Sequence, residues 1–457
     1  MNSRFCCWGA PAWLSAPARA WAAAAVMVML WPVPALAQDP STMVRPALPV
    51  PLTLLDALTF AGESHPQLRV AEAAVGLAEI HLREAQASYG IDVTLDLQPR
   101  VASRAALRGA NFENDSRYGI VVRKRLSDFG RSTSRHKAAA TAMKGEELAY
   151  RLARDQHAIE VMERFFAVIL ADLRYQADDE SMTVSFFRYK RLADRQQRFE
   201  QYSELEVKER EADYREAFVR RLRSDLDRRE TRNRLALALD HPDQLSGDLE
   251  MPDLAPYSGR EIPDYHELLE QVLAKAPVLA VLHEQVASAR ASLAAAGKHN
   301  TPVLSAEFQA RDYAQEIGSR DQYRVDLKMT VPLMDGRRLG ATRVARARNR
   351  LYQLQAQLAA AEYRLRDHLL EIVHQLQINQ AEQAAAFAQE EFRSYYQDRS
   401  RALYELELRS DLGDAQAHVA ETMWRSARVV FERALLWAEL DALLGRPLAL
   451  IQGRQQQ

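Results

Sequence analysis

The triplet Asp128-Phe129-Gly130 is the most suggestive chemical motif in this sequence, because protein kinases use Asp-Phe-Gly to hold the Mg²⁺ ions that accompany ATP. In a kinase this aspartate works together with a glycine-rich phosphate loop and a catalytic loop, and neither pattern occurs in the chain. We therefore predict that the three residues form a turn between a strand and a helix.

The 11 histidines are the next candidates for chemistry, since imidazole is a common zinc ligand and general base. They show neither a His-Glu-x-x-His pattern nor cysteine partners at the spacing of a zinc site. His81, His283 and His368 are therefore expected to be surface or packing residues. The sequence predicts no metal site and no cofactor.

Two pairs of neighbouring acids, Glu390-Glu391 and Asp178-Asp179, complete the set of candidate catalytic groups. Each pair lies on a predicted helix, where the side chains of adjacent residues diverge. Acid–base catalysis needs carboxylates that converge on one reacting group. The sequence therefore predicts that the protein is not an enzyme, and its function must be sought in its structural elements.

The N-terminal residues have the features of a secretory signal peptide. Arg4 and Arg19 precede an apolar run from Ala20 to Trp31, and Ala35-Leu36-Ala37 is a suitable cleavage site. We expect cleavage after the second of these alanines, which removes residues 1–37. A retained N-terminal membrane anchor is the alternative interpretation.

Both cysteines, Cys6 and Cys7, lie in this signal, so an exported chain that starts at Gln38 has no disulfide and no lipid-bearing cysteine. Removing the two signal arginines from the 60 basic residues leaves 58 against 62 acidic residues, a formal charge of −4. The densest basic run, Arg220 to Arg234, is interrupted by acids, which indicates a solvated helix face with paired charges. This balance argues against nucleic-acid binding.

Residues 321–334 have a two-residue period, which predicts a strand with one apolar and one polar face. Comparable alternation occurs at 93–103, 116–126 and 303–312. Beyond the signal, no apolar run approaches the eighteen or so residues of a membrane helix, so a membrane-spanning form must use strands. The apolar positions of the first stretch are Tyr323, Val325, Leu327, Met329, Val331 and Leu333, and the polar ones are Arg324, Asp326, Lys328 and Thr330.

After the Asp335-Gly336 turn signal the period changes from two to seven, which is typical of a coiled-coil seam. We expect a helix from Arg337 to about Asp398, which would be about 93 Å long at ~1.5 Å per residue. The seam residues are Val344, Leu351, Leu358, Leu365 and Ile372, with Ala347, Leu354 and Ala361 between them.

Residues from Gly130 to about Leu239 contain no proline and are rich in helix-forming residues. A reversal of this helical stretch is expected near Tyr202-Ser203. Ser203 and Glu206 have the spacing of a capping box, in which each residue caps the backbone N–H of the other. We therefore expect two long antiparallel helices in this part of the chain.

The order of the predicted elements occurs twice, which indicates an internal duplication. Pro66 and Pro277 correspond at an offset of about 211 residues, and Gly130 and Gly336 at about 206. The predicted units are the signal peptide (1–37), an extended N-terminal segment (38–51), a first repeat (52–240) with the strand pair 93–103/116–126, a linker (241–263), a second repeat (264–447) with the strand pair 303–312/321–334, and a tail (448–457).

Each repeat supplies two strands of about ten residues, the length of a tilted membrane-spanning strand. Four strands cannot close a barrel, and an open edge in lipid leaves backbone groups unpaired at several kcal/mol each. Several chains must therefore contribute to one barrel. A barrel of eight strands from two chains and a barrel of twelve strands from three chains both satisfy this condition.

Six short motifs occur in a fixed order along the exported chain. They are Ala57-Leu58, His65-Pro66-Gln67-Leu68, Asp128-Phe129-Gly130, Val331-Pro332-Leu333-Met334-Asp335-Gly336, Arg401-Ala402-Leu403-Tyr404-Glu405 and Leu443-Leu444-Gly445-Arg446-Pro447. Together with the duplicated strand pairs, this order resembles the TolC family of outer membrane efflux proteins. The resemblance implies a mixed α/β membrane protein: a homotrimer with a 12-stranded outer-membrane β-barrel, four strands per chain, continued by a periplasmic α-helical barrel of coiled coils.

The resemblance also implies a function and partners. The protein would be the exit duct of a tripartite efflux or type I secretion system, which passes small toxic solutes or secreted proteins passively to the exterior. Its partners would be a periplasmic adaptor, an inner-membrane pump and outer membrane lipid. The alternative is a non-transporting periplasmic coiled-coil adaptor or scaffold, but such a protein has no use for the apolar face of residues 321–334.

In the family, the periplasmic helix tips often carry a glycine where the adaptor docks. Here Glu407 stands in the second tip, while Gln201 and Tyr202, followed by Ser203, fill the first. The resemblance implies that these four residues contact the adaptor, and the missing glycine leaves the choice of adaptor open.

The family's closing gate uses tyrosine, arginine and aspartate near the second tip. Tyr404 and Arg409 match these residues by position, and Asp411 and Asp414 match the aspartates with a small shift. The resemblance therefore implies a periplasmic gate built from these four side chains.

Overall fold

The computed structural model describes residues 47–61, 65–102, 113–242, 244, 247–314, 321–332, 337–406 and 412–448. The chain consists of two units, Met1–Ala47 and Leu48–Gln457, and every element below belongs to the second unit. The predicted signal peptide, 1–37, most of the extended segment 38–51 and most of the tail 448–457 lie outside the described residues.

Within the described residues, helices make up most of the structure and strands form a small antiparallel sheet. The helices are α2 (Leu54–Ala61), α3 (Pro66–Ala87), α4 (Arg131–Phe199), α5 (Glu204–Ala238), α6 (Ala255–Ser258), α7 (Tyr265–Lys275), α8 (Pro277–Gly297), α9 (Arg337–Glu405) and α10 (Leu412–Leu443). The strands are β1 (Ile91–Gln98), β2 (Val101–Ala102), β3 (Glu113–Asn114), β4 (Arg117–Ser127), β5 (Val303–Tyr313) and β6 (Tyr323–Thr330).

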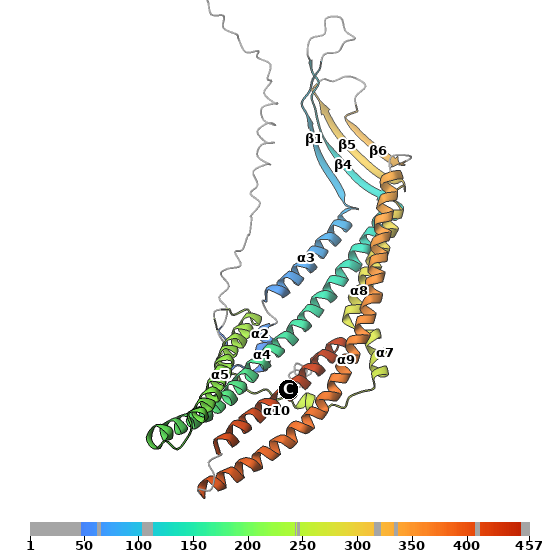
Figure 1. Ribbon diagram of the computed structural model, residues 1–457. Coiled ribbons are helices and arrows are strands. Elements are labelled where there is room, and N and C mark those ends of the chain that lie inside the picture. Colours follow the sequence, from blue (N-terminus) through green and yellow to red (C-terminus); the bar gives the residue numbers. More distant parts are fainter. Residues whose placement is uncertain are drawn as a thin grey trace, which may run out of the picture. The chain divides into compact units, whose positions relative to one another are not determined.

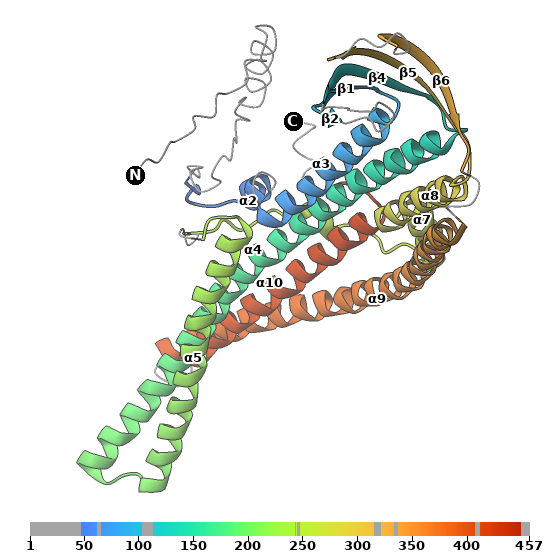
Figure 2. The same ribbon diagram turned by 90° about the horizontal axis from the view of Figure 1, so that it is seen from above.

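The main sheet has the order β1-β4-β5-β6, and all its neighbouring strands are antiparallel. Both predicted strand pairs are therefore confirmed, and the pairing of β4 with β5 joins the two halves of the chain. The short strands β2 and β3 pair with each other beyond the first strand pair. The four strands of the main sheet curve together (Figure 2).

The last strand is shorter than its alternating pattern predicts. It ends at Thr330, whereas the alternation continues to Leu333, and residues 333–334 lie outside the described part. Pro332 explains the difference, because proline has no N–H to donate to a neighbouring strand.

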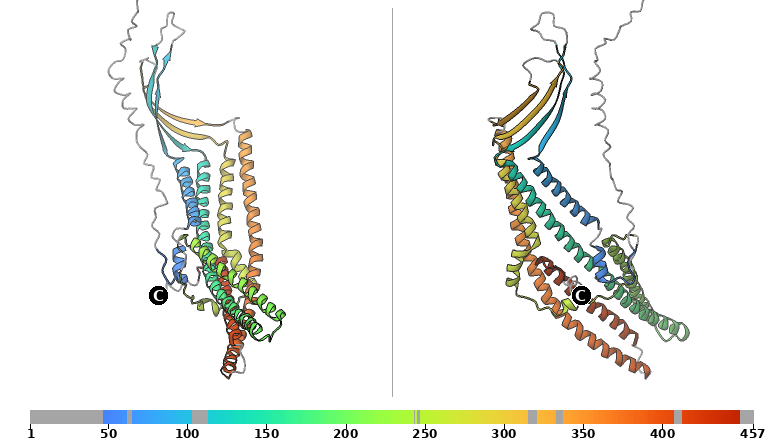
Figure 3. Two further views of the ribbon diagram at one scale, coloured as in Figure 1. Left: turned by 60° about the vertical axis from the view of Figure 1, so that its left-hand side comes forward. Right: turned by 180° about the vertical axis from the view of Figure 1, so that it is seen from behind.

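Four helices continue the strands in the same lateral order. The chain passes from α3 into β1, from β4 into α4, from α8 into β5 and from β6 into α9, and α3–α4, α4–α8 and α8–α9 are packed neighbours. Figure 1 shows each strand joined to its helix, and the left view of Figure 3 shows the four helices side by side in this order. One lateral edge of this unit is therefore β1 with α3, and the other is β6 with α9.

The two longest helices, α4 and α9, have 69 residues each, which makes them about 104 Å long at ~1.5 Å per residue. The helix α9 begins at Arg337 as predicted and continues past Asp398 to Glu405, since neither glycine nor proline occurs between Ala341 and Glu405. Four of the eight predicted seam residues are buried and the other four are half-buried: the buried ones are Leu354, Ala361, Leu365 and Ile372, and the half-buried ones are Val344, Ala347, Leu351 and Leu358.

The reversal between α4 and α5 occurs where the sequence predicts it. Glu200 closes α4 in the left-handed conformation with φ 52°. The Ser203 hydroxyl accepts the N–H of Glu206 at 3.3 Å, and the Glu206 carboxylate accepts the N–H of Ser203 at 2.8 Å. This is the predicted capping box.

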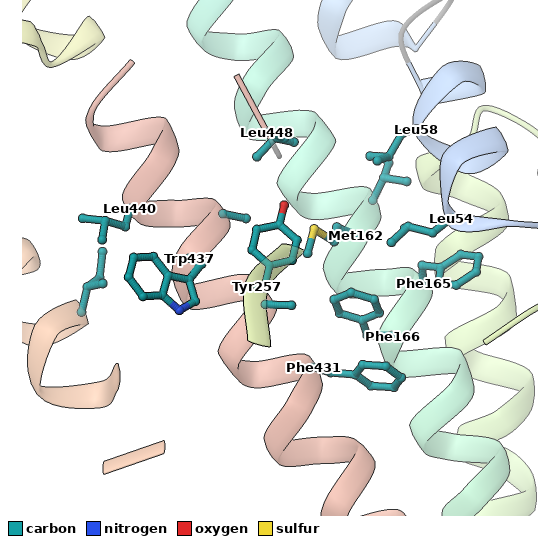
Figure 4. Close-up of a cluster of buried hydrophobic side chains, with 14 of the residues drawn as sticks. Leu54, Leu58, Met162, Phe165, Phe166, Tyr257, Phe431, Trp437, Leu440 and Leu448 are labelled. Atoms are coloured by element: carbon teal, nitrogen blue, oxygen red, sulfur yellow. The ribbon is translucent and has the colours of Figure 1, made fainter. Parts of the chain in front are cut away.

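The largest hydrophobic core lies where α4 and α10 meet residues 254–257. Phe166 of α4 stacks on Phe431 of α10 with ring centroids 4.4 Å apart, and Tyr257 and Trp437 lie in the same cluster (Figure 4). The predicted linker 241–263 is thus not a free connection, because Leu254 and Tyr257 are buried in this core. Its Leu249 also pairs with Leu52 as an isolated parallel bridge.

Candidate functional site

The strand register places apolar side chains on one face of the main sheet. Rows of paired residues cross all four strands, for example Val93–Val122–Phe308–Val325 and Leu95–Ile120–Ala310–Tyr323. The apolar face consists of Ile91, Val93, Leu95, Leu97, Tyr118, Ile120, Val122, Leu304, Ala306, Phe308, Ala310, Tyr323, Val325, Leu327 and Met329.

This apolar face is exposed in the single chain. Val325 is 79% exposed and Leu327 is 71% exposed, and the other apolar side chains of β6 and β1 are more than half exposed. A contiguous apolar patch of this kind marks a surface that meets lipid or another protein. The sequence singled out the β6 part of the face, and the register extends it across the whole sheet.

The opposite face of the sheet carries charged and polar side chains. The Arg123 Nε lies 3.1 Å from a carboxylate oxygen of Glu307 on the neighbouring strand, and the Arg324 Nε lies 2.7 Å from Asp326. Gln309 also donates to Glu307. Ion pairs of this kind suit contact with water, so the two faces of the sheet are fitted to different surroundings.

The triplet Asp128-Phe129-Gly130 is the predicted turn from strand to helix, between β4 and α4. The buried Asp128 carboxylate accepts the N–H of Ser132 at 2.9 Å, and Gly130 has φ 85°, which favours glycine. Arg131 donates to the carbonyl oxygens of Lys298, His299 and Thr301 at 2.9 to 3.1 Å. The corner between sheet and helices is therefore held by hydrogen bonds from both halves of the chain.

The predicted gate residues are only partly within the described residues. Tyr404 is exposed in the last turn of α9, and Asp414 lies in the first turn of α10. Arg409 and Asp411 lie outside the described residues. The structure therefore places two of the four gate candidates, one near the end of α9 and the other near the start of α10.

Asp414 makes an ion pair with Arg188 of α4, a residue that sequence reasoning missed. Beside it, Gly413 packs on Val184, because a Cβ atom at Gly413 would lie 2.9 Å from a methyl group of that valine. The pair lies at a polar cavity of about 280 Å³ that Arg174, Asp178 and His418 also line. No local pattern could have revealed this contact, since its residues are 226 positions apart.

The predicted adaptor-contact residues lie at the turn between α4 and α5. Gln201 and Ser203 are exposed and Tyr202 is half-buried. Glu407 of the second tip lies outside the described residues. The described part of the first tip thus offers polar side chains to solvent.

The histidines singled out from the sequence have ordinary surroundings where partners are described. His81 lies 3.2 Å from Glu84, and His368 lies 3.8 Å from Glu371. The described residues contain no group of three His, Cys, Asp or Glu side chains arranged to hold a metal ion.

The neighbouring acids belong to separate contacts. Asp178 pairs with Arg174 at 3.2 Å, and Asp179 pairs with Arg221 at 2.9 Å, while Glu390 accepts the Ser426 hydroxyl at 3.3 Å. The basic run 220–234 is paired, as predicted, but partly across helices, since Arg228 and Arg232 of α5 both contact Asp172 of α4.

Sequence reasoning also missed a pair of stacked histidines at the start of α3. The rings of His65 and His157 have centroids 4.2 Å apart, and His157 is 4% exposed. The Nδ1 atom of His65 accepts the N–H of Gln67 at 3.4 Å and so caps α3. Burial lowers the pKa of His65, and the neighbouring His157 lowers it further.

Among the described helices, none has both the length and the apolar character required to cross a membrane. Neither a family model nor a curated protein sequence matches the chain.

Solved structures do match it. The CmeC outer membrane channel of Campylobacter jejuni has a TM-score of 0.70 at 14% identity, covering 86% of this chain and 85% of that one. The outer membrane protein VceC of Vibrio cholerae has a TM-score of 0.68 at 15% identity, covering 86% and 96%. The open state of the MtrE outer membrane channel of Neisseria gonorrhoeae has a TM-score of 0.67 at 15% identity, covering 86% and 89%.

Each of these matches covers 86% of the chain. The matched structures are outer membrane proteins and channels. At identities of 14 to 15% the likeness concerns the fold. The chain has the fold of the TolC-family outer membrane channels, as the order of its sequence motifs predicted.

Proposed function

We propose that this protein is the outer membrane exit duct of a tripartite efflux or type I secretion system. The observation that carries the proposal is the two-faced sheet, whose apolar side chains are exposed on one face and whose ion pairs lie on the other. A sheet with these faces suits the wall of a membrane channel, with lipid outside and water inside. A periplasmic scaffold, the alternative function, has no use for the apolar face.

The duct is proposed to be a homotrimer. Within the described residues, β1 and β6 are paired on one side only, and lipid would leave the backbone groups of their free edges without partners. An edge-to-edge contact between β1 of one copy and β6 of the next closes under three-fold rotation and forms a barrel of about twelve strands.

The helices support the same assembly. The edge helices expose apolar side chains that a neighbouring copy could cover, among them Val70 of α3 and Tyr352 and Tyr363 of α9. Because the helices keep the lateral order of the strands, the ring of strands continues into a ring of coiled coils. We place this helical part in the periplasm, where its tips meet an adaptor linked to an inner-membrane pump.

Disulfide trapping tests the trimer, since the only cysteines of the chain lie in the predicted signal peptide. A cysteine at Val93 of β1 is combined with single cysteines along β6, from Tyr323 to Met329. We expect cross-linked species that stop at three chains on a non-reducing gel. Cysteines at Val93 and Phe308, which share a row within one chain, are the control and should give no ladder. A ladder that stops at two chains would contradict the trimer.

The closed state is proposed to be held at the periplasmic end by exchangeable polar contacts around Tyr404, Arg409, Asp411 and Asp414. The ion pair of Asp414 with Arg188 supports this, because it connects the α9–α10 hairpin to the α4–α5 hairpin. Charge-assisted hydrogen bonds suit a lock that a partner must open, since the partner's own groups can replace them one by one.

Conductance of the protein in planar bilayers tests the gate. We expect Arg188→Ala and Arg409→Ala to conduct more than the wild type while the trimer stays intact. Arg195→Ala, an exposed arginine on the same helix, is the matched control and should leave the conductance unchanged. Equal conductance in all four proteins would place the constriction elsewhere.

A further inference from the structure

Lys124 interrupts the apolar face of the main sheet. Its row reads Ile91–Lys124–Ala306–Leu327, and both end residues of this row are more than 60% exposed. Within the described strands, one other charged residue lies on this face: Asp312, which is opposite Tyr118 at the other end of the sheet. Lys124 is therefore a cation set into a surface that the proposed function assigns to lipid.

Lys124 is exposed, and it has no ion-pair partner within the described residues. Its neighbour Arg123 shows the contrast, because that side chain points to the other face and pairs with Glu307 at 3.1 Å. The small side chain of Ala306 beside Lys124 leaves the lysine uncovered on that side. A charge on a lipid-facing surface is tolerated where it can reach the polar headgroups.

The position of Lys124 along β4 fits such a reach. Tyr118 and Lys124 are six residues apart on the same strand, which corresponds to about 20 Å along it and about 15 Å across a membrane at a tilt of ~40°. The apolar band of an outer-membrane barrel is about 25 Å tall. The two positions are thus closer together than the band is tall. The long lysine side chain at one end and the tyrosine side chain at the other reach across most of this difference.

We propose that Lys124 binds the phosphate of a phospholipid headgroup in the periplasmic leaflet of the outer membrane. The inference rests on the proposed function, which places the α4 end of β4 toward the periplasm. The ammonium group donates hydrogen bonds to the phosphate oxygens, and the three copies of the trimer repeat the contact around the barrel. Together with the tyrosines at the opposite end, these contacts fix the depth of the sheet in the membrane.

Native mass spectrometry of retained lipid tests the contact. The full-length trimer is reconstituted into vesicles of phosphatidylethanolamine and phosphatidylglycerol, extracted in mild detergent and weighed with its bound lipids. We expect Lys124→Met to retain about five-fold less phospholipid than the wild type, and Lys124→Arg to retain as much. Lys328→Met removes a lysine from the opposite face near the same end of the sheet and should leave the retained lipid unchanged.

The outcomes separate this inference from the proposed function. If the wild-type protein does not insert into the vesicles, both the proposed duct function and the proposed lipid contact are contradicted. If it inserts but Lys124→Met retains as much phospholipid as the wild type, only the lysine contact falls. A lipid-free sample in detergent with inorganic phosphate is the third arm. Phosphate retained there in a Lys124-dependent way would identify a site for the free anion and overturn the lipid assignment.

Discussion

Asp128 belongs to a motif that suggests catalysis, but its role in this protein is structural. Its carboxylate is 2% exposed, and it accepts the N–H of Ser132 with both oxygens at 2.9 and 3.1 Å. Phe129 and Gly130 take positive φ values of 54° and 85° in the turn that follows. The three residues that resemble a catalytic motif thus redirect the chain from a strand into a helix.

Asp128→Ala should destabilise this corner. The substitution removes the acceptor for the Ser132 N–H and hydroxyl, and the loss of such a capping acceptor costs about 1–2 kcal/mol. The measurement is the free energy of unfolding in denaturant for protein refolded in detergent. Asp128→Asn keeps an acceptor oxygen and should recover part of the loss, whereas equal losses in both variants would argue against the capping role.

The pH dependence of stability should reflect His65. The pKa of His65 is lowered in the folded state, so between the lowered value and about 6.5 the unfolded chain binds the proton more readily. The stabilisation by neutral His65 is therefore present above about pH 6.5 and is lost as the pH falls below it. The groups that face His65 are His157, which opposes protonation, and Asp240 and Glu160, which favour it.

Hydrogen exchange at the start of α3 measures this effect. After correction for intrinsic rates, the amides of the first turn should exchange faster at pH 5.5 than at pH 7.5. His65→Asn keeps a capping side chain without a titrating ring, so its protection should change much less. The same pH dependence in this variant would assign the effect to another group. His283→Asn, a histidine on α8, is the control.

At the scale of elements, the register of the strands separates the apolar and polar faces of the sheet, and ion pairs join the two helices of the α4–α5 hairpin. A shift of one residue in the pairing would move every apolar side chain of a strand to the polar face. In the hairpin, Arg228 and Arg232 of α5 both contact Asp172 at 2.7 to 2.8 Å. These ion pairs join the two helices in addition to apolar contacts such as that of Tyr214 of α5 with Phe186 of α4.

Leu327→Arg should weaken the barrel far more than Lys328→Gln, because the two residues are adjacent on β6 but lie on opposite faces. An arginine on the lipid side near the middle of a barrel costs about 2–4 kcal/mol, whereas a polar exchange on the water side costs little. The measurement is the amount of oligomer that remains on a gel after the sample is heated, compared with an unheated sample. Similar losses for both variants would show that the faces are assigned incorrectly.

At the scale of the whole molecule, the lateral order of helices and strands is the same, so one open-edged layer runs from the sheet into the coiled coils. Both edges of this layer carry exposed apolar side chains, such as Val93 of β1 and Val325 of β6. Assembly with further copies is the proposed way in which these surfaces become covered.

The predicted signal peptide gives a prediction for the whole molecule. We expect the mature protein to begin at Gln38 and to fractionate with the outer membrane, because the predicted signal peptide ends at Ala37. Intact-mass analysis of the purified protein and fractionation of cell envelopes provide the measurements. A retained N-terminus, or recovery of all the protein from the soluble periplasm, would contradict the duct.

The sequence by itself determined the elements of the fold, because their signals are local. Alternation of apolar and polar residues predicted both strand pairs, the heptads from Val344 to Ile372 predicted α9, and Ser203 with Glu206 predicted the reversal between α4 and α5. Each of these signals depends on residues a few positions apart, where backbone geometry alone decides which side chains share a face. The boundaries differed where a single residue intervened, as Pro332 does after β6.

Only the tertiary structure decided which distant residues meet. The pairing of β4 with β5 unites the strand pairs in one sheet, the linker buries Tyr257 in the core, Arg188 pairs with Asp414, and His65 stacks on His157. These contacts join positions far apart in the chain, and their formation depends on how whole elements pack against one another. No periodicity within one segment carries that information, because it resides in the complementary surfaces of two segments.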